Sequence, residues 1–485
     1  MIAPALETLT LLSNLQSAAL ATSTQRGVYA GEPYGAPTAA FADYFRIPAE
    51  LVEFESPKRK TSKAGYFTFS NTVCFGHCDA AVLSDTVTNG LAEVSPVVEI
   101  GDGFVKLPFD LTEVVSNLRG ERYFRTSPSA LNTMTSSNAS RMMYYLVRPL
   151  LPVPIRKYLQ RIRLSGWERI AFPQWPVDCS VDALMRSAMA LALKCADVIE
   201  LPFIWFWPDG AAAAAIITHD IETRAGQAMS RAVMDLDDAF GFKSAFQIVP
   251  EVHSSAPGEF LREIRQRGFE GNIHDLNHDG HLFRSRQLFE QRAEQINRYA
   301  ATFGTRGFRA AAMHRVQDWF GALDMSFDMS VPNVAHLEPQ RGGCCTVMPY
   351  FIGHIVELPL TTIQDYSLFH ILADYSTSTW KQQIESILSN HGLITILTHP
   401  DYLKRQRAKR VYAELLRHLR LTCEQRNVWA TLPSDVDDWW RSRQQMRLVR
   451  EKHRWRVDGP DSHRARVAYA TLENGRVVYK LHGTQ

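Results

Sequence analysis

Apolar and polar positions along residues 211–452 alternate in the manner of strands and helices. The clearest strand is the apolar run AAAAAII at 211–217, which ends abruptly in Thr218, His219 and Asp220. Further apolar runs predict strands at 244–249, 271–276, 307–313, 323–329, 355–361, 393–398 and 428–432. The segments between them predict helices at 223–240, 257–267, 283–303, 380–390, 408–426 and 434–452. This alternation of about seven strands with helices predicts a parallel α/β sheet that closes, or nearly closes, into a barrel.

The regions on either side of the expected barrel follow other patterns. Residues 1–200 predict an accessory region with a small α/β element at about 65–125 and a Ser-, Thr- and Asn-rich linker at about 127–140. The barrel itself is expected over 201–453. Residues 454–485 predict a tail, in which the Asn474-Gly475 pair is typical of the type I′ turn of a β-hairpin.

Composition places the chain among ordinary globular proteins. Hydrophobic residues make up 45% of the sequence and charged residues 21%. The net charge of +2 indicates no polyanionic partner. The basic stretches at 404–410 and 441–454 contain apolar residues as well, which favours solvated helix faces over a nucleic-acid interface. Seven cysteines without a regular framework are typical of a reducing compartment.

The N-terminal sequence predicts no export signal, because it carries Glu7 and no early Lys or Arg. No stretch of the chain approaches the roughly 18 apolar residues of a membrane span. We therefore expect a cytoplasmic protein without a membrane span. Peripheral membrane association and the oligomeric state stay open.

Two carboxylates follow the first strand of the expected barrel. Side chains two residues apart on a strand share a face, so Asp220 and Glu222 are expected to lie together. They repel each other unless a cation or a proton lies between them. The alternative interpretation makes Asp220 the N-cap of the helix that begins near Thr223. The carboxyl ends of parallel strands are the usual place of an α/β active site.

Polar residues also lie at the ends of later strands, which a barrel brings to one rim. They are His274, His278, His281, Arg309, Asp328 and His399. Each has a structural alternative, as a core histidine, a surface arginine or a helix cap. Together, however, Glu222, His274 and His278 form a set of two imidazoles and one carboxylate, which leaves an open position for water on a zinc-like ion. Such an ion lowers the pKa of bound water toward about 7, and Asp220 and His399 would then act as base and acid.

The order of these residues resembles the polysaccharide deacetylase family, which contains chitooligosaccharide and peptidoglycan deacetylases. The resemblance covers roughly residues 202–440. THDIE is similar to the Asp-Asp motif of the family, with the metal carboxylate two residues after the base. HDLNH resembles its two-histidine motif and FRAAA its arginine motif. SFDMS resembles its fourth motif and ILTHPD its last motif.

The resemblance implies a distorted (β/α)7 barrel and the hydrolysis of an acetyl amide or ester on a glycan. The implied metal is divalent, with zinc foremost and cobalt or manganese as alternatives. The implied roles are Asp220 as base, Arg309 as the residue that orients it, His399 as acid, Asp328 as the residue that tunes the acid, and Glu222, His274 and His278 as metal ligands. His219, Asp275 and His281 are expected around this set.

Two departures from the family pattern keep other functions open. The metal carboxylate is Glu222 rather than Asp, and Ala311 and Ala312 stand where the family has proline and an aromatic residue. Loss of that aromatic residue favours, as an alternative, hydrolysis of another non-peptide C–N bond, as in a cyclic imide or ureide. A third hypothesis is a catalytically silent barrel that binds in polysaccharide assembly, with the N-terminal region as a scaffold. For the leading hypothesis, the expected partner is an acetylated saccharide, either nucleotide- or lipid-linked or a glycan intermediate at the inner membrane face.

Overall fold

A computed structural model describes residues 37–48, 51–57, 63–126, 161–251, 257–452 and 454–481. All of them belong to one contact-defined unit, Tyr34–Gln485. The predicted linker at 127–140 lies outside the described residues. The predicted division at about residue 200 stays a prediction.

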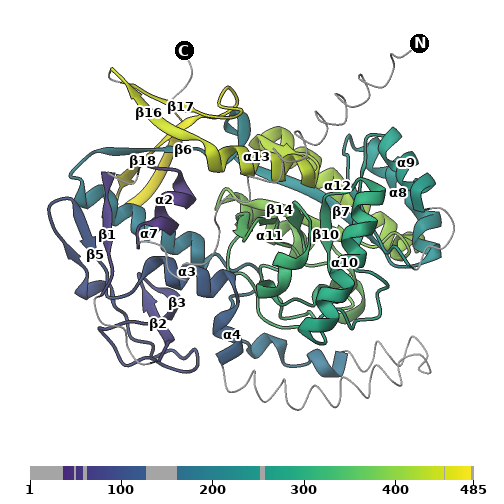
Figure 1. The fold of residues 1–485 in the computed structure, drawn as a ribbon, viewed down its shortest axis with the longest axis horizontal. Helices are drawn as coiled ribbons and strands as arrows, with labels where there is room; N and C mark the ends of the chain where they lie inside the picture. The colour runs from purple at the N-terminus through teal and green to yellow at the C-terminus, as the bar shows by residue number, and fades with distance from the viewer. Residues whose placement is uncertain are drawn as a thin grey trace, which may run out of the picture. The chain divides into compact units, whose positions relative to one another are not determined.

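The larger part of this unit is built around a nine-stranded sheet (Figure 1). Its parallel strands are β7 (Ala213–Ile221), β8 (Ala245–Ile248), β9 (Glu270–His274), β10 (Gly307–Arg309), β11 (Phe327–Asp328), β13 (Ile355–Glu357), β14 (Leu393–Thr398) and β15 (Val428–Ala430). Strands β7 to β11 and then β13 follow one another across the sheet in chain order, and β14 returns to pair with β7. The remaining strand, β12 (Tyr350–Ile352), runs antiparallel to β13.

The seam between β13 and β14 is joined by threonine side chains instead of a backbone ladder. Thr361 donates to the Leu393 carbonyl at 2.6 Å, and Thr362 donates to the Thr395 carbonyl at 2.7 Å. Thr395 in turn donates to the Pro359 carbonyl at 2.7 Å. These bonds replace a missing strand pair, so the predicted distorted (β/α)7 barrel is confirmed.

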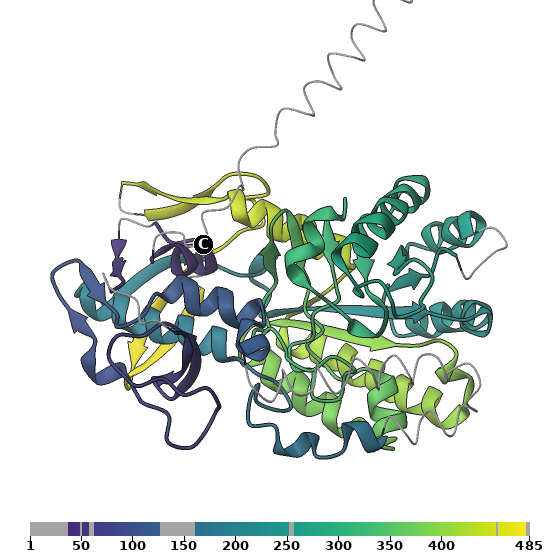
Figure 2. The same ribbon diagram turned by 60° about the horizontal axis from the view of Figure 1, so that its bottom comes forward.

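Helices cover the outside of this sheet in both ribbon views (Figure 1, Figure 2). They are α8 (Arg224–Ala239), α9 (Pro257–Gln266), α10 (Arg286–Phe303), α11 (Ser378–Leu388), α12 (Gln406–Arg426) and α13 (Pro433–Gln445). Ser285 caps α10 by accepting a hydrogen bond from the Leu288 backbone at 3.2 Å, and Gly304 ends it in a left-handed conformation. None of the described helices is long and apolar enough to cross a bilayer.

The predicted helix at 434–452 is wrong in its last turns. Helix α13 ends at Gln445, and Arg447–Glu451 forms strand β16. This strand pairs in antiparallel register with β17 (Arg454–Asp458), from Arg447 opposite Asp458 to Glu451 opposite Arg454. Cross-strand pairing therefore overrides the helical pattern of this basic stretch.

The accessory region forms a second cluster of small sheets and helices. Its elements are α2 (Ala39–Phe45), β1 (Glu53–Glu55), β2 (Gly65–Phe69), β3 (Thr72–Gly76), β4 (Glu99–Ile100), β5 (Phe104–Lys106), α3 (Leu111–Arg119), α4 (Arg122–Thr126) and α7 (Ser180–Cys195). The predicted C-terminal hairpin is present as β18 (Val467–Glu473) and β19 (Arg476–Leu481), which β6 (Glu200–Ile204) extends to three strands. Asn474 and Gly475 both have positive φ, as a type I′ turn requires.

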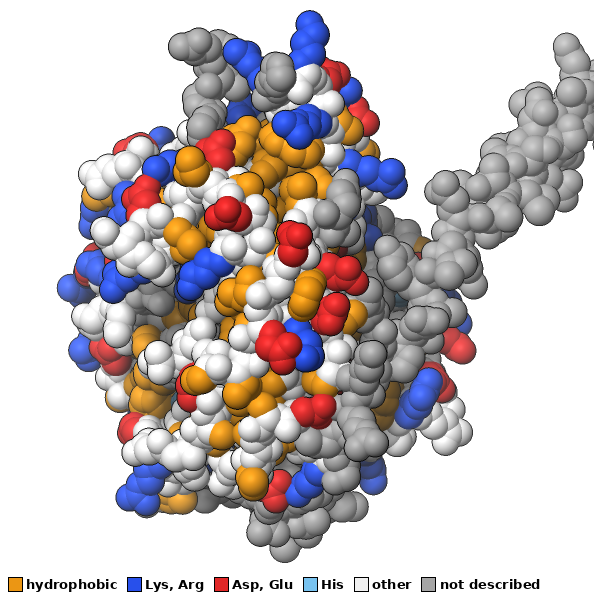
Figure 3. All heavy atoms as spheres, turned by 90° about the vertical axis from the view of Figure 1, so that its left-hand side faces the viewer, with side chains coloured by type: hydrophobic (Ala, Val, Ile, Leu, Met, Phe, Trp, Pro, Cys, Tyr) orange, Lys and Arg blue, Asp and Glu red, His pale blue; other side chains and the backbone are white. Residues whose placement is uncertain are grey.

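One face of the molecule shows how its charges are distributed (Figure 3). Acidic and basic side chains are interspersed there, with small apolar patches between them. This face therefore offers no single-sign field for a polyanion.

A buried ion pair joins the accessory region to the barrel. Arg315, which is fully buried, donates to the Glu121 carboxylate from Nε at 2.7 Å and again from Nη2. The same carboxylate accepts from the Gly343 backbone at 2.6 Å. Glu121 therefore connects α3 and α4 to two loops of the barrel.

We expect Glu121→Ala to lower the free energy of unfolding by about 3–5 kcal/mol, because it leaves the buried Arg315 charge without its partner. Denaturant unfolding followed by circular dichroism measures this change. The matched control is Asp438→Ala, which removes a solvent-exposed pair with Arg306 and should cost about 0–1 kcal/mol. Equal effects of the two variants would contradict the structural role of the buried pair.

Candidate active site

Alternation along β7 decides which side chains enter the barrel. Ala214 and Ile216 pack with residues of the barrel interior, whereas Ala213, Ala215 and Ile217 pack toward the outer helices. Continuing the alternation places Thr218 and Asp220 inside and His219 outside. The strand therefore aims one carboxylate into the barrel, and Glu222 follows it beyond the strand end.

The N-cap interpretation of Asp220 is wrong. Thr223 is the N-cap of α8, and its hydroxyl accepts a hydrogen bond from the Gly226 backbone at 3.0 Å. The Asp220 carboxylate instead accepts a hydrogen bond from the Arg309 Nη1 at 2.8 Å. Asp220 is thus available to a site inside the barrel.

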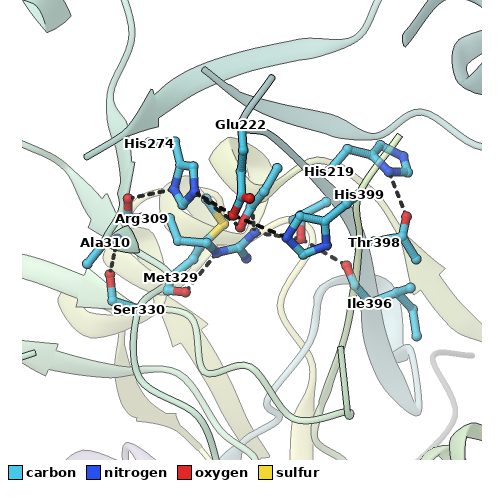
Figure 4. A network of polar contacts seen from close by, with 12 residues as sticks. His219, Glu222, His274, Arg309, Ala310, Met329, Ser330, Ile396, Thr398 and His399 are labelled. Carbon is cyan, nitrogen blue, oxygen red and sulfur yellow. Dashed lines mark hydrogen bonds and ion pairs between the residues drawn. The ribbon is translucent and has the colours of Figure 1, made fainter. Parts of the chain in front are cut away.

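Arg309 spans the barrel interior from β10. Its Nη1 also donates to the Thr218 hydroxyl at 3.0 Å, and its Nε donates to the Met329 carbonyl at 3.0 Å. Figure 4 shows the guanidinium in the middle of the network, between the rings of His274 and His399, with Glu222 above it. Both Arg309 and Asp220 are almost completely buried, so solvent screens their attraction little.

The electrostatic surroundings keep Asp220 ionised. Burial by itself raises the pKa of this carboxyl, but Arg309, and then His274 and His399, lower it below its usual value. An ionised, oriented carboxylate can accept a proton from a bound molecule.

Glu222, His274 and His278 bring three ligand atoms within 4.8 Å of one another. The Glu222 Oε1 lies 2.9 Å from the His278 Nε2 and 3.8 Å from the His274 Nε2. Burial raises the pKa of Glu222, but His278 and then His274 and His399 lower it well below its usual value. The carboxylate is therefore in the charged state that a metal ligand requires.

The orientation of His274 fits a metal ion. Its Nδ1 lies 3.1 Å from the Arg309 carbonyl, which directs Nε2 toward Glu222 and Asp220. That Nε2 is buried and has no hydrogen-bond partner among the described residues. A buried ring nitrogen aimed at a carboxylate and a second imidazole is the donor set that zinc prefers.

Asp275 lies between the two histidines and supports their loop. Its carboxylate accepts from the Leu276 backbone at 2.6 Å and from the Ala311 backbone at 3.3 Å. Asp275 and His278 both adopt positive φ, which gives the loop the tight shape that returns His278 to the site. The place of Asp275 around the ligand set stays a prediction.

His399 is paired with a carboxylate that the sequence patterns did not single out. Its Nδ1 lies 2.7 Å from Oδ1 of Asp365, and its backbone N–H donates to the other carboxylate oxygen at 2.8 Å. Burial lowers the pKa of His399, but Asp365, and then Glu222, raise it well above its usual value. Asp365 lies four residues beyond the predicted strand at 355–361, so inspection of that strand end would have found it.

Asp328 does not contact His399, contrary to its predicted role as the residue that tunes the acid. Its carboxylate accepts from the Ser330 hydroxyl at 2.7 Å and the Ser330 backbone at 2.9 Å. Asp328 also lies beside Glu357, its register partner on β13. Burial, and then the Asp328 carboxyl, raise the pKa of Glu357 well above its usual value. The carboxylate that contacts His399 is instead that of Asp365.

His219 and His281 lie outside this set. His219 faces away from the site, with its ring nitrogens 2.8 Å from the Thr398 hydroxyl and 3.0 Å from the Asp237 carboxylate (Figure 4). The side chain of His281 is 42% exposed and lies 3.5 Å from the Asp279 carboxylate. Neither side chain has a described contact with Glu222, His274 or His278.

In the comparison with known proteins, only solved structures resemble the chain. No protein-family model and no curated protein matches the chain. A putative polysaccharide deacetylase from Mycobacterium smegmatis matches at 15% identity and a TM-score of 0.40, over 51% of this chain and 98% of that chain. The PuuE allantoinase matches at 13% identity and a TM-score of 0.38, over 48% and 92%.

The peptidoglycan deacetylase PdaC from Bacillus subtilis matches at 12% identity and a TM-score of 0.32, over 49% of this chain and 96% of that chain. Polysaccharide and peptidoglycan deacetylases are thus among the solved structures that the chain resembles, as its motifs predict. Each match accounts for about half of this chain. At this identity and TM-score the likeness concerns the fold, and the case for a function rests on the site.

We expect His274→Ala to weaken Zn²⁺ binding by about 100-fold or more, because it removes one of three ligands. Titration calorimetry on metal-free protein measures this affinity. His281→Ala is the matched control, since it removes a neighbouring histidine that is not one of the three residues of the set. Unchanged affinity in His274→Ala would assign the metal to other residues.

Proposed function

We propose that this protein is a metal-dependent hydrolase that removes acetyl groups from an acetylated sugar. The observation that carries the proposal is the position of Asp220 and His399 on either side of Glu222, His274 and His278. The Asp220 Oδ2 lies 3.7 Å from the His274 Nε2, and the His399 Nε2 lies 3.5 Å from the Glu222 Oε1. A base and an acid therefore flank one candidate metal site.

The set of Glu222, His274 and His278 would hold the ion. When bound, a divalent cation such as zinc, or alternatively cobalt or manganese, would polarise an acyl oxygen and make water a better nucleophile near neutral pH. Asp220 takes the proton of the attacking water, and Arg309 keeps this carboxylate ionised and oriented before the reaction.

His399 supplies the proton that the leaving group needs. Attack of water on the acetyl carbonyl breaks the bond to the sugar nitrogen or oxygen, which leaves with the proton from His399. The products are acetate and a free amine or hydroxyl. Asp365 is a positioning residue, because its bond to Nδ1 fixes the ring and directs the Nε2 proton to the site.

We place this activity in the cytoplasm, on a nucleotide- or lipid-linked saccharide or on a glycan intermediate at the inner membrane face. The seven cysteines, which form no disulfide among the described residues, support a reducing compartment.

A second candidate is the hydrolysis of another non-peptide C–N bond, as in a cyclic imide or ureide. The residues that follow Arg309 favour it, because Ala310, Ala311 and Ala312 provide no aromatic surface for a sugar. Assaying acetylated sugars and ring amides on one preparation separates the two candidates.

We expect the zinc-loaded protein to release acetate from acetylated sugars, and Asp220→Asn and His399→Ala each to lower kcat by about 10²–10⁴-fold. Each variant removes one proton-transfer group and leaves the metal ligands in place. Acetate release, measured by a coupled assay, tests both. The roles assigned to Asp220 and His399 fail if both variants keep the wild-type rate.

We expect Asp365→Asn to move the basic limb of the kcat/KM profile to lower pH. The carboxylate raises the pKa of His399, so its neutralisation lowers that pKa and deprotonates the acid at a lower pH. A pH series of acetate release on the variant and the wild type measures the shift. A uniform rate loss without movement of the limb would show that Asp365 acts on the fold alone.

A further inference from the structure

An aromatic side chain lies directly against the proposed acid. Tyr402 follows His399 by three residues, and its backbone N–H donates to the His399 carbonyl at 3.1 Å. The two rings lie 4.9 Å apart between centroids, with an interplanar angle of 31°. Tyr402 begins the short helix η9 (Tyr402–Lys404), so the same turn fixes both rings.

Two further aromatic rings lie against Tyr402. The His370 ring lies 4.9 Å from the Tyr402 ring, and the Tyr366 ring lies 6.0 Å from it. Both come from the segment after Asp365, which includes the π-helix η8 (Ser367–Ile371). Single π-turns in proteins are frequent at functional sites. Tyr366 and Tyr402 both remain partly exposed.

The Tyr402 phenol is a free donor beside the site. No described residue hydrogen-bonds to it, and Glu222, Asp365 and Asp401 lie nearby. Burial and then these three carboxylates raise the pKa of Tyr402 well above its usual value. The phenol therefore keeps its proton near neutral pH.

We propose that Tyr402 is a substrate-contacting residue whose phenol donates a hydrogen bond to an oxygen of the sugar that carries the acetyl group. This inference rests on the proposed deacetylase function and names where its sugar binds. The sugar lies on the leaving-group side, against the partly exposed rings of Tyr402 and Tyr366.

The chemistry of this surface matches a sugar ring. A phenol combines an apolar ring with a polar end, and a sugar combines an apolar face with hydroxyl groups at its edge. The position also follows from the proposed reaction, because the leaving group must lie at His399. The three residues that follow Arg309 are alanines and offer no aromatic surface, whereas Tyr402 places a ring against His399.

The test compares Tyr402→Phe with the wild type on two substrates, using full-length zinc-loaded protein. We expect kcat/KM to fall about 10-fold on an acetylated glucosamine oligosaccharide, the effect of one lost hydrogen bond. On 4-nitrophenyl acetate, which has no sugar hydroxyl, we expect no change, because phenylalanine preserves the packing on His399. Titration with the deacetylated oligosaccharide should show a matching loss of affinity. Tyr299→Phe, on α10, is the control for loss of a phenol elsewhere.

Three outcomes would overturn this assignment. Equal losses on both substrates would mean that Tyr402 acts on the acid or the base. Weaker zinc binding by Tyr402→Phe would mean that the phenol orients Glu222. Wild-type values on the oligosaccharide and in the titration would exclude the contact altogether. Absence of acetate release from any sugar by the wild type would reject the proposed function itself, together with this extension.

Discussion

The bond between Arg309 and Asp220 is the constraint around which the barrel interior is arranged. The arginine starts on β10, yet its guanidinium reaches Asp220 and Thr218 on β7 and the Met329 carbonyl after β11. An uncompensated buried guanidinium would be costly, so the strands that supply its partners are held in one relative position. The backbone carbonyl of Arg309 also lies 3.1 Å from Nδ1 of the His274 ring. Arg309 thus positions both Asp220, the proposed base, and His274, a candidate metal ligand.

Charge balance explains why so many carboxylates can share one rim. Asp220 faces Arg309, Glu222 faces two imidazoles, and Asp365 faces His399. Each pairing opposes the cost of burial, so the pKa values of Asp220 and Glu222 fall while that of His399 rises. Such opposed shifts between neighbouring groups separate a proton acceptor from a proton donor in one site. Asp328 and Glu357 make no described ion pair, and burial raises the pKa of both carboxyls.

The sequence was sufficient for the parts of this site that depend on local pattern. The apolar run before Asp220 and the polar residues at successive strand ends predict the barrel, and barrel geometry brings those ends together. Asp365 was missed because it lies four residues beyond the end of the predicted strand at 355–361, and its importance shows only in its contact with His399. Asp328 was assigned the tuning role because SFDMS resembles the fourth motif of the family, whereas in the structure it lies opposite Glu357 in the register of β11 and β13. The strand at Arg447–Glu451 was likewise decided by its partner strand, not by its own pattern.

A buried ion pair connects the accessory region to the loop that follows Arg309. Arg315 lies six residues after Arg309, in the loop that leaves the site, and its Nη1 donates to the Met313 carbonyl at 2.8 Å. Its partner Glu121 comes from the accessory region and also accepts a hydrogen bond from Gly343, in a second loop of the barrel. Ala312 and Met313 adopt positive φ in the first of these loops, a conformation that the surrounding structure must hold. The ion pair between Arg315 and Glu121 stabilises this loop conformation from outside the barrel. The accessory region is therefore part of what shapes the rim beside Arg309, although it contributes none of the residues assigned to proton transfer or to metal binding.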